Sequence, residues 1–181
     1  MLQRASQLLD SRCNNVAGGT FHAFGNIMLR KYAHHIGYSP QFTILDRSDS
    51  EDLISQIRKS KPEIKGDKRF PKKGTIASII GKAINADKTL STIISNEYPQ
   101  FLEFIDTINN ISREYEEQKQ EMKVMDYDDL LTKFSTLLRT NPEVRAELQS
   151  QFKYIMVDEY QDTNHSQSEI ITHLTNSDQN I

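Results

Sequence analysis

Apolar residues recur along this chain with two spacings, one typical of helices and the other typical of buried strands. Residues 21–37 carry apolar side chains three and four positions apart, which predicts a helix that stops at Gly37. Short apolar stretches at 16–20 and 42–46 flank this helix and favour strands, and the amphipathic stretch 2–12 fits the end of an earlier helix. Helices and strands that alternate along the chain in this way are typical of a parallel α/β sheet.

The strand-like stretches then stop for the long middle section of the chain. Three segments there place apolar residues at helical intervals, and they cover 48–60, 73–86 and 99–123. We therefore expect a large all-helical insertion at 48–125, between two parts of one sheet domain that cover 1–47 and 126–181.

Two helices and a strand are predicted after the insertion. The first helix begins near residue 125 and places its apolar side chains on one face: Leu130, Leu131, Phe134, Leu137 and Leu138. Pro142 suits the first turn of a short helix that runs to residue 152. The next apolar run, Tyr154 to Val157, lacks alternation, as expected for a parallel strand that helices cover on both faces.

The composition narrows the class of protein. Of the 181 residues, 36% are hydrophobic and 26% are charged, and no apolar run approaches the roughly 18 residues of a membrane span. The N-terminus lacks the apolar stretch of a signal peptide. The single cysteine, Cys13, excludes an internal disulfide and a multi-cysteine zinc site, so we expect a cytoplasmic protein with no membrane partner.

The net charge of −3 gives no general attraction to nucleic acid, but the charges are unevenly distributed. Residues 58–73 hold eight Lys or Arg and two acidic residues, a local net charge of +6. Such a segment is either a solvated loop or a surface that binds phosphates with release of counterions. Both interpretations stay open.

A cluster of acids and an amide follows the expected strand at 154–157. Ligands of parallel sheets bind beyond the carboxyl ends of the strands, which is where Asp158 and Glu159 fall. Asp158 could hold Mg²⁺ through its water shell, and Glu159 could deprotonate a water that attacks a nucleotide γ-phosphate. Alternatively, Asn164 and Gln167 form a capping box for the next helix, which leaves Asp158, Glu159 and Gln161 without a role.

Several strings in the sequence resemble motifs of one family. VDEYQDTN at 157–164 resembles the DExx box of the superfamily 1 DNA helicases of the UvrD, Rep and PcrA type, whose usual form is DE(F/Y)QDTN. GTFHAF at 19–24 resembles the TFH motif of these helicases, and MDYDDLL at 125–131 resembles the segment after their inserted domain. RASQLL at 4–9 resembles the tail of their motif Ia helix. The resemblance covers essentially the whole chain.

The resemblance implies a partial RecA-like P-loop NTPase sheet, called domain 1A, with a helical insertion called 1B. The motor would be ATP-dependent and move 3′ to 5′ on single-stranded DNA in DNA repair or replication. Its cofactors would be ATP and Mg²⁺, and its partners single-stranded DNA and junctions with duplex. The motif assigns Asp158 to Mg²⁺ and assigns Glu159 and Gln161 to catalysis. It assigns four residues to nucleotide binding: Asp158, Glu159, Gln161 and Asp162.

The same resemblance assigns Thr20, His22 and Tyr127 to the DNA strand, with Tyr127 offering an aromatic face to the bases. The residues themselves leave a plainer alternative open in each case. Thr20 could cap the helix that follows it, His22 could be a structural hydrogen-bonding group, and Tyr127 could pack in a core.

The phosphate-binding loop of such motors, GxxxxGK[ST], is missing from the sequence. The nearest string, GTIASIIGK at 74–82, has glycines seven apart and is followed by Ala83, where a hydroxyl is required. In the family this loop lies upstream of the region covered here, and the second RecA-like domain is also absent. We expect the chain to be an internal piece of a longer helicase that alone neither hydrolyses ATP nor unwinds DNA appreciably.

Two other functions stay open from the sequence. The chain could be a non-catalytic DNA-binding or interaction module, with residues 58–73 as its working surface. It could also belong to the motor subunit of a helicase-nuclease of the AddA or RecB kind, which shares these motifs.

Overall fold

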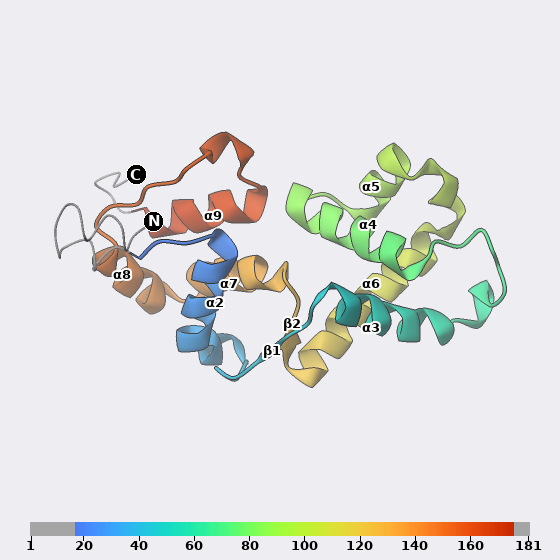
Figure 1. Cartoon of the computed structure of the whole chain (residues 1–181), viewed down its shortest axis with the longest axis horizontal. Helices are drawn as coiled ribbons and strands as arrows, with labels where there is room; N and C mark the ends of the chain where they lie inside the picture. Colours follow the sequence, from blue (N-terminus) through green and yellow to red (C-terminus); the bar gives the residue numbers. More distant parts are fainter. Residues whose placement is uncertain (1–16, 176–181) are drawn as a thin grey trace.

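The computed structural model describes residues 17–175, which are mostly helical with one small parallel sheet. Figure 1 shows two helical lobes side by side, connected where the strands lie. The first lobe contains α2 (Phe21–Tyr32), α7 (Asp129–Thr140), α8 (Pro142–Gln151) and α9 (His165–Leu174). The second lobe contains α3 (Arg47–Lys59), α4 (Lys73–Ala86), α5 (Leu90–Glu97) and α6 (Ile105–Met122). Short 3₁₀ helices lie at η2 (Ala33–Ile36), η3 (Pro62–Ile64), η4 (Pro99–Phe104) and η5 (Tyr160–Asp162).

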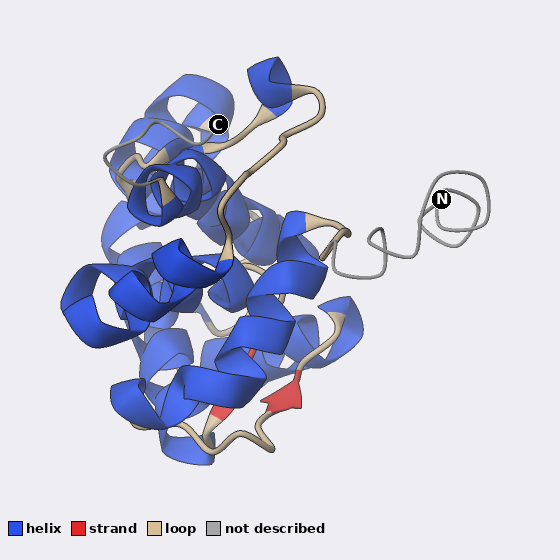
Figure 2. Cartoon of the chain, turned by 90° about the vertical axis from the view of Figure 1, so that its left-hand side faces the viewer, coloured by secondary structure: helices blue, strands red, loops and turns tan. Residues whose placement is uncertain are grey.

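Strands β1 (Thr43–Ile44) and β2 (Val124–Met125) pair in parallel and carry the chain between the lobes. Thr43 pairs with Val124 and Ile44 with Met125. The Leu45 amide extends the ladder by donating to the Met125 carbonyl at 2.8 Å. Figure 2 shows the strands in red within an otherwise helical molecule. The chain therefore leaves the first lobe and returns to it at the same place.

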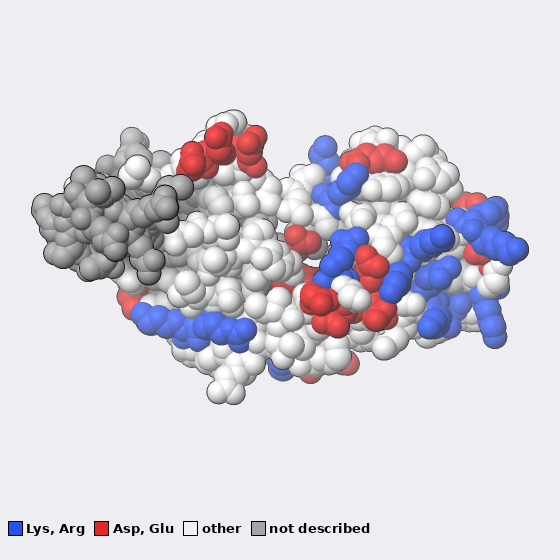
Figure 3. Space-filling view, viewed as in Figure 1, with Lys and Arg blue, Asp and Glu red and all other residues white. Residues whose placement is uncertain are grey.

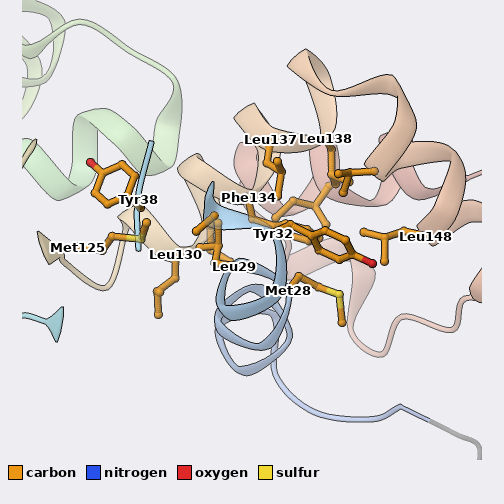
Figure 4. Close-up of a cluster of buried hydrophobic side chains, with 14 of the residues drawn as sticks. Met28, Leu29, Tyr32, Tyr38, Met125, Leu130, Phe134, Leu137, Leu138 and Leu148 are labelled. Atoms are coloured by element: carbon orange, nitrogen blue, oxygen red, sulfur yellow. The ribbon is translucent and has the colours of Figure 1, made fainter. Parts of the chain in front are cut away.

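The helix predicted over 21–37 is present as α2 and η2, and Gly37 ends it with a left-handed φ of 80°. Gly25 lets α2 approach α7 closely, because a Cβ there would lie 2.7 Å from the Leu130 carbonyl oxygen. Side chains between these helices form the first hydrophobic core, to which α8 and α9 also contribute (Figure 4). The apolar face predicted for α7 is buried in this core: Leu130, Leu131, Phe134, Leu137 and Leu138.

The second lobe has a hydrophobic core of its own, built by α3, α4, α5 and α6. The Phe70 and Phe104 rings meet edge to face in it, with 5.0 Å between their centroids. Each helix turns an apolar stripe inward, which is why helical spacing in the sequence predicts the segments of α3, α4 and α6, whereas α5 is not among the predicted helices. The isoleucines buried most deeply are Ile54, Ile57, Ile76, Ile79, Ile94, Ile108 and Ile111.

The prediction of a strand at 154–157 is wrong for the described structure. These residues follow α8 along an unpaired path, and Tyr154 and Met156 are 86% and 96% exposed. Ile155 still packs against the first core. A strand needs a neighbour for its backbone hydrogen bonds, and within residues 17–175 the two strands pair only with each other.

The other strand predictions are met in part. β1 covers 2 of the residues expected at 42–46, and the described part of 16–20 contains no strand. The helix end expected at 2–12 lies outside the described residues. None of the helices within 17–175 is long and apolar enough to cross a bilayer. The described fold is compatible with the expected α/β class, while the RecA-like sheet stays a prediction.

Candidate functional site

Two residues that the sequence assigns to the DNA strand, His22 and Tyr127, lie side by side in the structure. Their ring centroids are 4.6 Å apart, with an interplanar angle of 32°. His22 lies in the first turn of α2, and Tyr127 lies in the turn before α7. Tyr127 is 62% exposed, so it is not a core residue. The pair forms an open aromatic surface on which a base could stack.

Thr20 caps the helix that carries His22. Its Oγ1 accepts a hydrogen bond from the Ala23 amide at 3.2 Å, and the residue is exposed. The capping role is therefore confirmed. This bond does not use the hydroxyl proton, so Thr20 could still donate to a phosphate oxygen, and its DNA contact stays a prediction.

Burial keeps His22 largely neutral. Burial lowers its pKa from the usual 6.5, and the charge of Asp128 opposes this effect. Burial raises the pKa of Asp128, while a hydrogen bond from the Asn85 side chain favours its ionised form. At pH 7 the His22 ring therefore has one nitrogen that donates and one that accepts a hydrogen bond.

Two reciprocal hydrogen bonds fix the turn before α7. The Asp129 amide donates to Asp126 Oδ1 at 2.9 Å, and the Asp126 amide donates to Asp129 Oδ2 at 3.0 Å. This is the pattern of a capping box, with a carboxylate at both positions. Because Tyr127 and Asp128 lie between these residues, the turn sets the direction of both side chains.

A buried lysine of the second lobe holds the same turn. Lys119 Nζ on α6 lies 2.7 Å from Asp126 Oδ2 and 2.7 Å from Asp129 Oδ2, and its side chain is 2% exposed. The Tyr115 hydroxyl also donates to Asp126 Oδ2, at 2.8 Å. Burial disfavours the charge of Lys119, but the neighbouring carboxylates, with Asp129 and Asp126 first, outweigh this and raise its pKa.

Sequence reasoning missed Lys119, although the sequence contains a signal for it. The residue falls on the apolar face of α6, in helical register with Ile108, Ile111 and Tyr115. A lysine at a core position needs carboxylate partners, and MDYDDLL follows it closely in the sequence. The combination predicts a contact between α6 and that turn.

A cavity of about 280 Å³ lies beside the stacked pair, between the two lobes. Tyr127 and Asp128 line it from the turn before α7, and Arg47, Ile80 and Gly81 line it from the second lobe. Since Tyr127 belongs to both the stack and the cavity wall, a ligand that stacks on this ring would also meet the cavity.

The residues predicted for the nucleotide lie together in an exposed turn and in η5: Asp158, Glu159, Gln161 and Asp162. Glu159 has a left-handed φ of 51°, and its carboxylate accepts a hydrogen bond from the Gln161 side chain. Figure 3 shows an acidic patch over this part of the first lobe. The ion pairs of residues 17–175 involve other carboxylates, so these acids face solvent.

The donor atoms of this loop fit a magnesium ion. Mg²⁺ prefers oxygen ligands and keeps several of its waters, so one or two carboxylates together with substrate phosphates commonly hold it. Among the described residues, no three His, Cys, Asp or Glu side chains converge to enclose a metal. Asp158 would therefore share the ion with water and phosphate oxygens, and this role stays a prediction.

The capping box predicted for the helix after the acidic cluster is confirmed. Asn164 Oδ1 accepts from the Gln167 amide at 3.0 Å, and Gln167 Oε1 accepts from the Asn164 amide at 3.1 Å. Asn164 also donates from Nδ2 to Asn85 Oδ1 of the second lobe at 2.5 Å. The end of the DEYQDTN string therefore touches the second lobe.

The basic segment 58–73 lies at the end of the second lobe that is far from the first, where Figure 3 shows Lys and Arg gathered. Part of its charge is neutralised locally, since Lys61, Arg69 and Lys73 form ion pairs with nearby acids. Its other lysines are exposed: Lys59, Lys65, Lys68 and Lys72.

Comparison with known proteins identifies the family. The model of the UvrD/REP helicase N-terminal domain matches residues 1–181. The chain is 29% identical over 181 residues to an ATP-dependent DNA helicase PcrA of Staphylococcus epidermidis, and 28% identical to one of Staphylococcus aureus. Each match covers 100% of this chain and 24% of the relative, so the chain spans about a quarter of their length. The chain belongs to the UvrD/REP helicase N-terminal domain family.

Proposed function

We propose that this chain is part of an ATP-dependent DNA helicase that moves 3′ to 5′ along single-stranded DNA, in DNA repair or replication. The observation that carries the proposal is the exposed stack of His22 on Tyr127. The two rings come from the TFH and DYDD strings, which lie far apart in the sequence and meet only in the fold. Membership of the helicase family supports the same class of activity.

On the DNA side, Tyr127 offers an open ring face to a base. Stacking works with any base, because every base has a π face. The Thr20 hydroxyl and the neutral His22 ring can donate hydrogen bonds to backbone phosphates beside the stack. Such contacts carry little sequence information, which suits a motor that must move along any strand.

On the nucleotide side, we propose that Asp158 holds Mg²⁺ and that Glu159 accepts the proton of the attacking water. The bound Mg²⁺–ATP would supply the phosphoryl group and the free energy for movement. Gln161 already contacts the Glu159 carboxylate, so its side chain is placed to respond when that carboxylate engages water. Asp162, one residue on in η5, would pass this change to the following helix.

The isolated chain should not turn over ATP at an appreciable rate. The sequence contains no GxxxxGK[ST] loop, so nothing in it supplies the backbone cradle and lysine that bind the phosphates. A longer protein that adds this loop and a second RecA-like domain should be active. Substantial ATP turnover by the 181 residues with single-stranded DNA would contradict this part of the proposal.

Binding of a fluorescein-labelled oligothymidine to the 181-residue chain tests the DNA contact. Tyr127→Ala should weaken binding about 5- to 150-fold, which corresponds to the ~1–3 kcal/mol of one lost stacking contact. Tyr154→Ala is a matched control, because this tyrosine is 86% exposed but lies in the unpaired segment 154–157. Equal affinities of the wild-type chain and Tyr127→Ala would refute the contact.

The exposed lysines of segment 58–73 support a second candidate, a non-catalytic DNA-binding module. Its binding would depend on phosphate contacts and would weaken steeply with salt. Replacing Lys59, Lys65, Lys68 and Lys72 by glutamine would abolish binding in this case, whereas Tyr127→Ala would have little effect. The opposite result would favour the helicase proposal.

A further inference from the structure

We propose that Asn85 of the helical insertion is a positioning residue that links Asn164, at the end of the DEYQDTN string, to Asp128, beside Tyr127. The link consists of two consecutive hydrogen bonds through one side chain. It rests on the proposed function, because it would connect the nucleotide side of the first lobe with its DNA side.

The link joins three elements that are distant in the sequence. Asn164 Nδ2, at the start of α9, donates to Asn85 Oδ1 at 2.5 Å. Asn85 Nδ2, near the end of α4, donates to Asp128 Oδ1 at 3.1 Å and to the Gly81 carbonyl at 2.8 Å. All three linked side chains are half-buried, which limits competition from water.

The direction of each hydrogen bond is fixed by chemistry. The Gly81 carbonyl and an ionised Asp128 can only accept, so the NH₂ group of Asn85 must face them and its oxygen must face Asn164. The oxygen of Asn164 is already used by the Gln167 amide, so the NH₂ group of Asn164 must face Asn85. Each side-chain amide in the link therefore has one orientation. A change at Asn164 then alters the hydrogen bond from Asn85 to Asp128.

Glycine at position 81 allows Asp128 to lie close to α4. A Cβ at Gly81 would lie only 3.2 Å from Asp128 Oδ2. A second contact lies nearby, since His165 Nε2 on α9 is 3.6 Å from Asp87 Oδ2 at the end of α4. Figure 1 shows the end of α4 facing the start of α9 across the gap between the lobes. The lobes thus meet here as well as at β1 and β2.

The last step runs from Asp128 to the aromatic pair. Its charge acts on His22, which stacks on Tyr127. The charged groups around Asp128 are Asp126, His22 and Lys119. A movement of Asn164 with the acidic loop would release or reorient Asn85, change the position of Asp128, and so alter the surface offered to DNA.

The first test is the titration of the Asp128 carboxyl group, measured by NMR in the 181-residue chain. Asn85→Ala should raise the Asp128 pKa, because it removes a donor to the ionised form. Asn164→Ser keeps a capping oxygen for α9 but removes the donor to Asn85, and it should also raise this pKa. The double variant should match Asn85→Ala, since both changes act on one path.

A matched control is Asn141→Ser. Asn141 caps α8 through its side-chain oxygen, as Asn164 caps α9, but its side chain is not part of the link. It should leave the Asp128 pKa unchanged. An Asn164→Ser variant whose Asp128 pKa equals that of the wild type would overturn the link, as would equal shifts in the Asn141→Ser control.

The second test uses the full-length protein and measures ATP turnover with and without single-stranded DNA. Asn85→Ala should reduce the stimulation by DNA about fivefold or more and leave turnover without DNA unchanged. Normal stimulation in Asn85→Ala would overturn the role of the link and leave the proposed function intact. Absence of stimulation in the wild type would refute the proposed function, while the carboxyl titration would still decide whether the link exists.

Discussion

Lys119 and Asp126 form a buried ion pair that joins the two lobes, with Nζ of the lysine 2.7 Å from Oδ2 of the aspartate. Their side chains are 2% and 13% exposed. The pair attaches α6 to the turn that carries Tyr127, so the second lobe fixes the position of a residue in the proposed DNA surface. Removing one partner of such a pair leaves the other buried and uncompensated.

Lys119→Met should destabilise the chain by about 3–5 kcal/mol, because Asp126 and Asp129 lose their buried cation. Urea unfolding followed by circular dichroism measures this change. Lys88→Met is the control, since Lys88 is exposed, and it should change the free energy of unfolding by less than about 0.5 kcal/mol. Equal stabilities of the two variants would contradict the importance of the ion pair.

The pH dependence of this difference is a separate prediction. Burial alone would raise the pKa of Asp126, but Lys119 and its hydrogen bonds lower it below the usual 3.8. A lowered folded-state pKa gives stability that is complete above the unfolded value and is lost as the pH falls through the folded value. In the wild type this contribution should therefore persist from pH 7 down to about pH 4.

In Lys119→Met the sign should reverse. Without the cation, burial raises the pKa of Asp126, so the folded state binds a proton more readily than the unfolded state. Lowering the pH from 7 to 4 then stabilises the variant relative to the wild type. The difference in unfolding free energy between them should shrink over this range, and a constant difference would contradict the assigned charges.

Gly25→Ala should destabilise the first lobe by about 1–3 kcal/mol. The added Cβ would lie 2.7 Å from the Leu130 carbonyl oxygen, so α2 and α7 would have to move apart. Gly19→Ala is the control, because its Cβ would lie 3.7 Å from the Ala23 side chain, an ordinary contact. Thermal unfolding of both variants measures the effect, and an unchanged midpoint for Gly25→Ala would contradict the close packing.

The sequence predicts those features that depend on neighbouring residues in the chain. The apolar face of α7, the glycine stop at Gly37 and the capping box of Asn164 with Gln167 are local patterns, and the structure confirms each of them. Their geometry is set within one or two helical turns, so the residue spacing carries the information.

The features that the sequence did not predict depend on partners far along the chain. The apolar run at 154–157 has strand composition, but a strand also needs a paired neighbour, and the described residues offer none. The stacking of His22 on Tyr127 arises when distant segments of the first lobe meet, and the contacts of Lys119 and Asn85 arise when the two lobes pack. Motif resemblance identified His22 and Tyr127 separately but not their proximity.

The exposed side chain of Met156 should make the isolated chain prone to self-association. It is 96% exposed in a segment whose backbone is unpaired, a combination that favours pairing with another chain. Met156→Lys should reduce association at high concentration, measured by analytical ultracentrifugation, with almost no loss of stability. Ile155→Lys should instead destabilise the fold, because Ile155 packs against the first core. Unchanged association in Met156→Lys would contradict this explanation.

The central claim is that the His22–Tyr127 pair contacts single-stranded DNA. NMR of the aromatic side chains during titration with an oligothymidine tests it most directly. The ring resonances of both residues should shift together, with one dissociation constant, while those of the exposed Tyr154 stay in place. Saturating DNA that leaves the His22 and Tyr127 rings unshifted, with shifts confined to residues 58–73, would contradict the account.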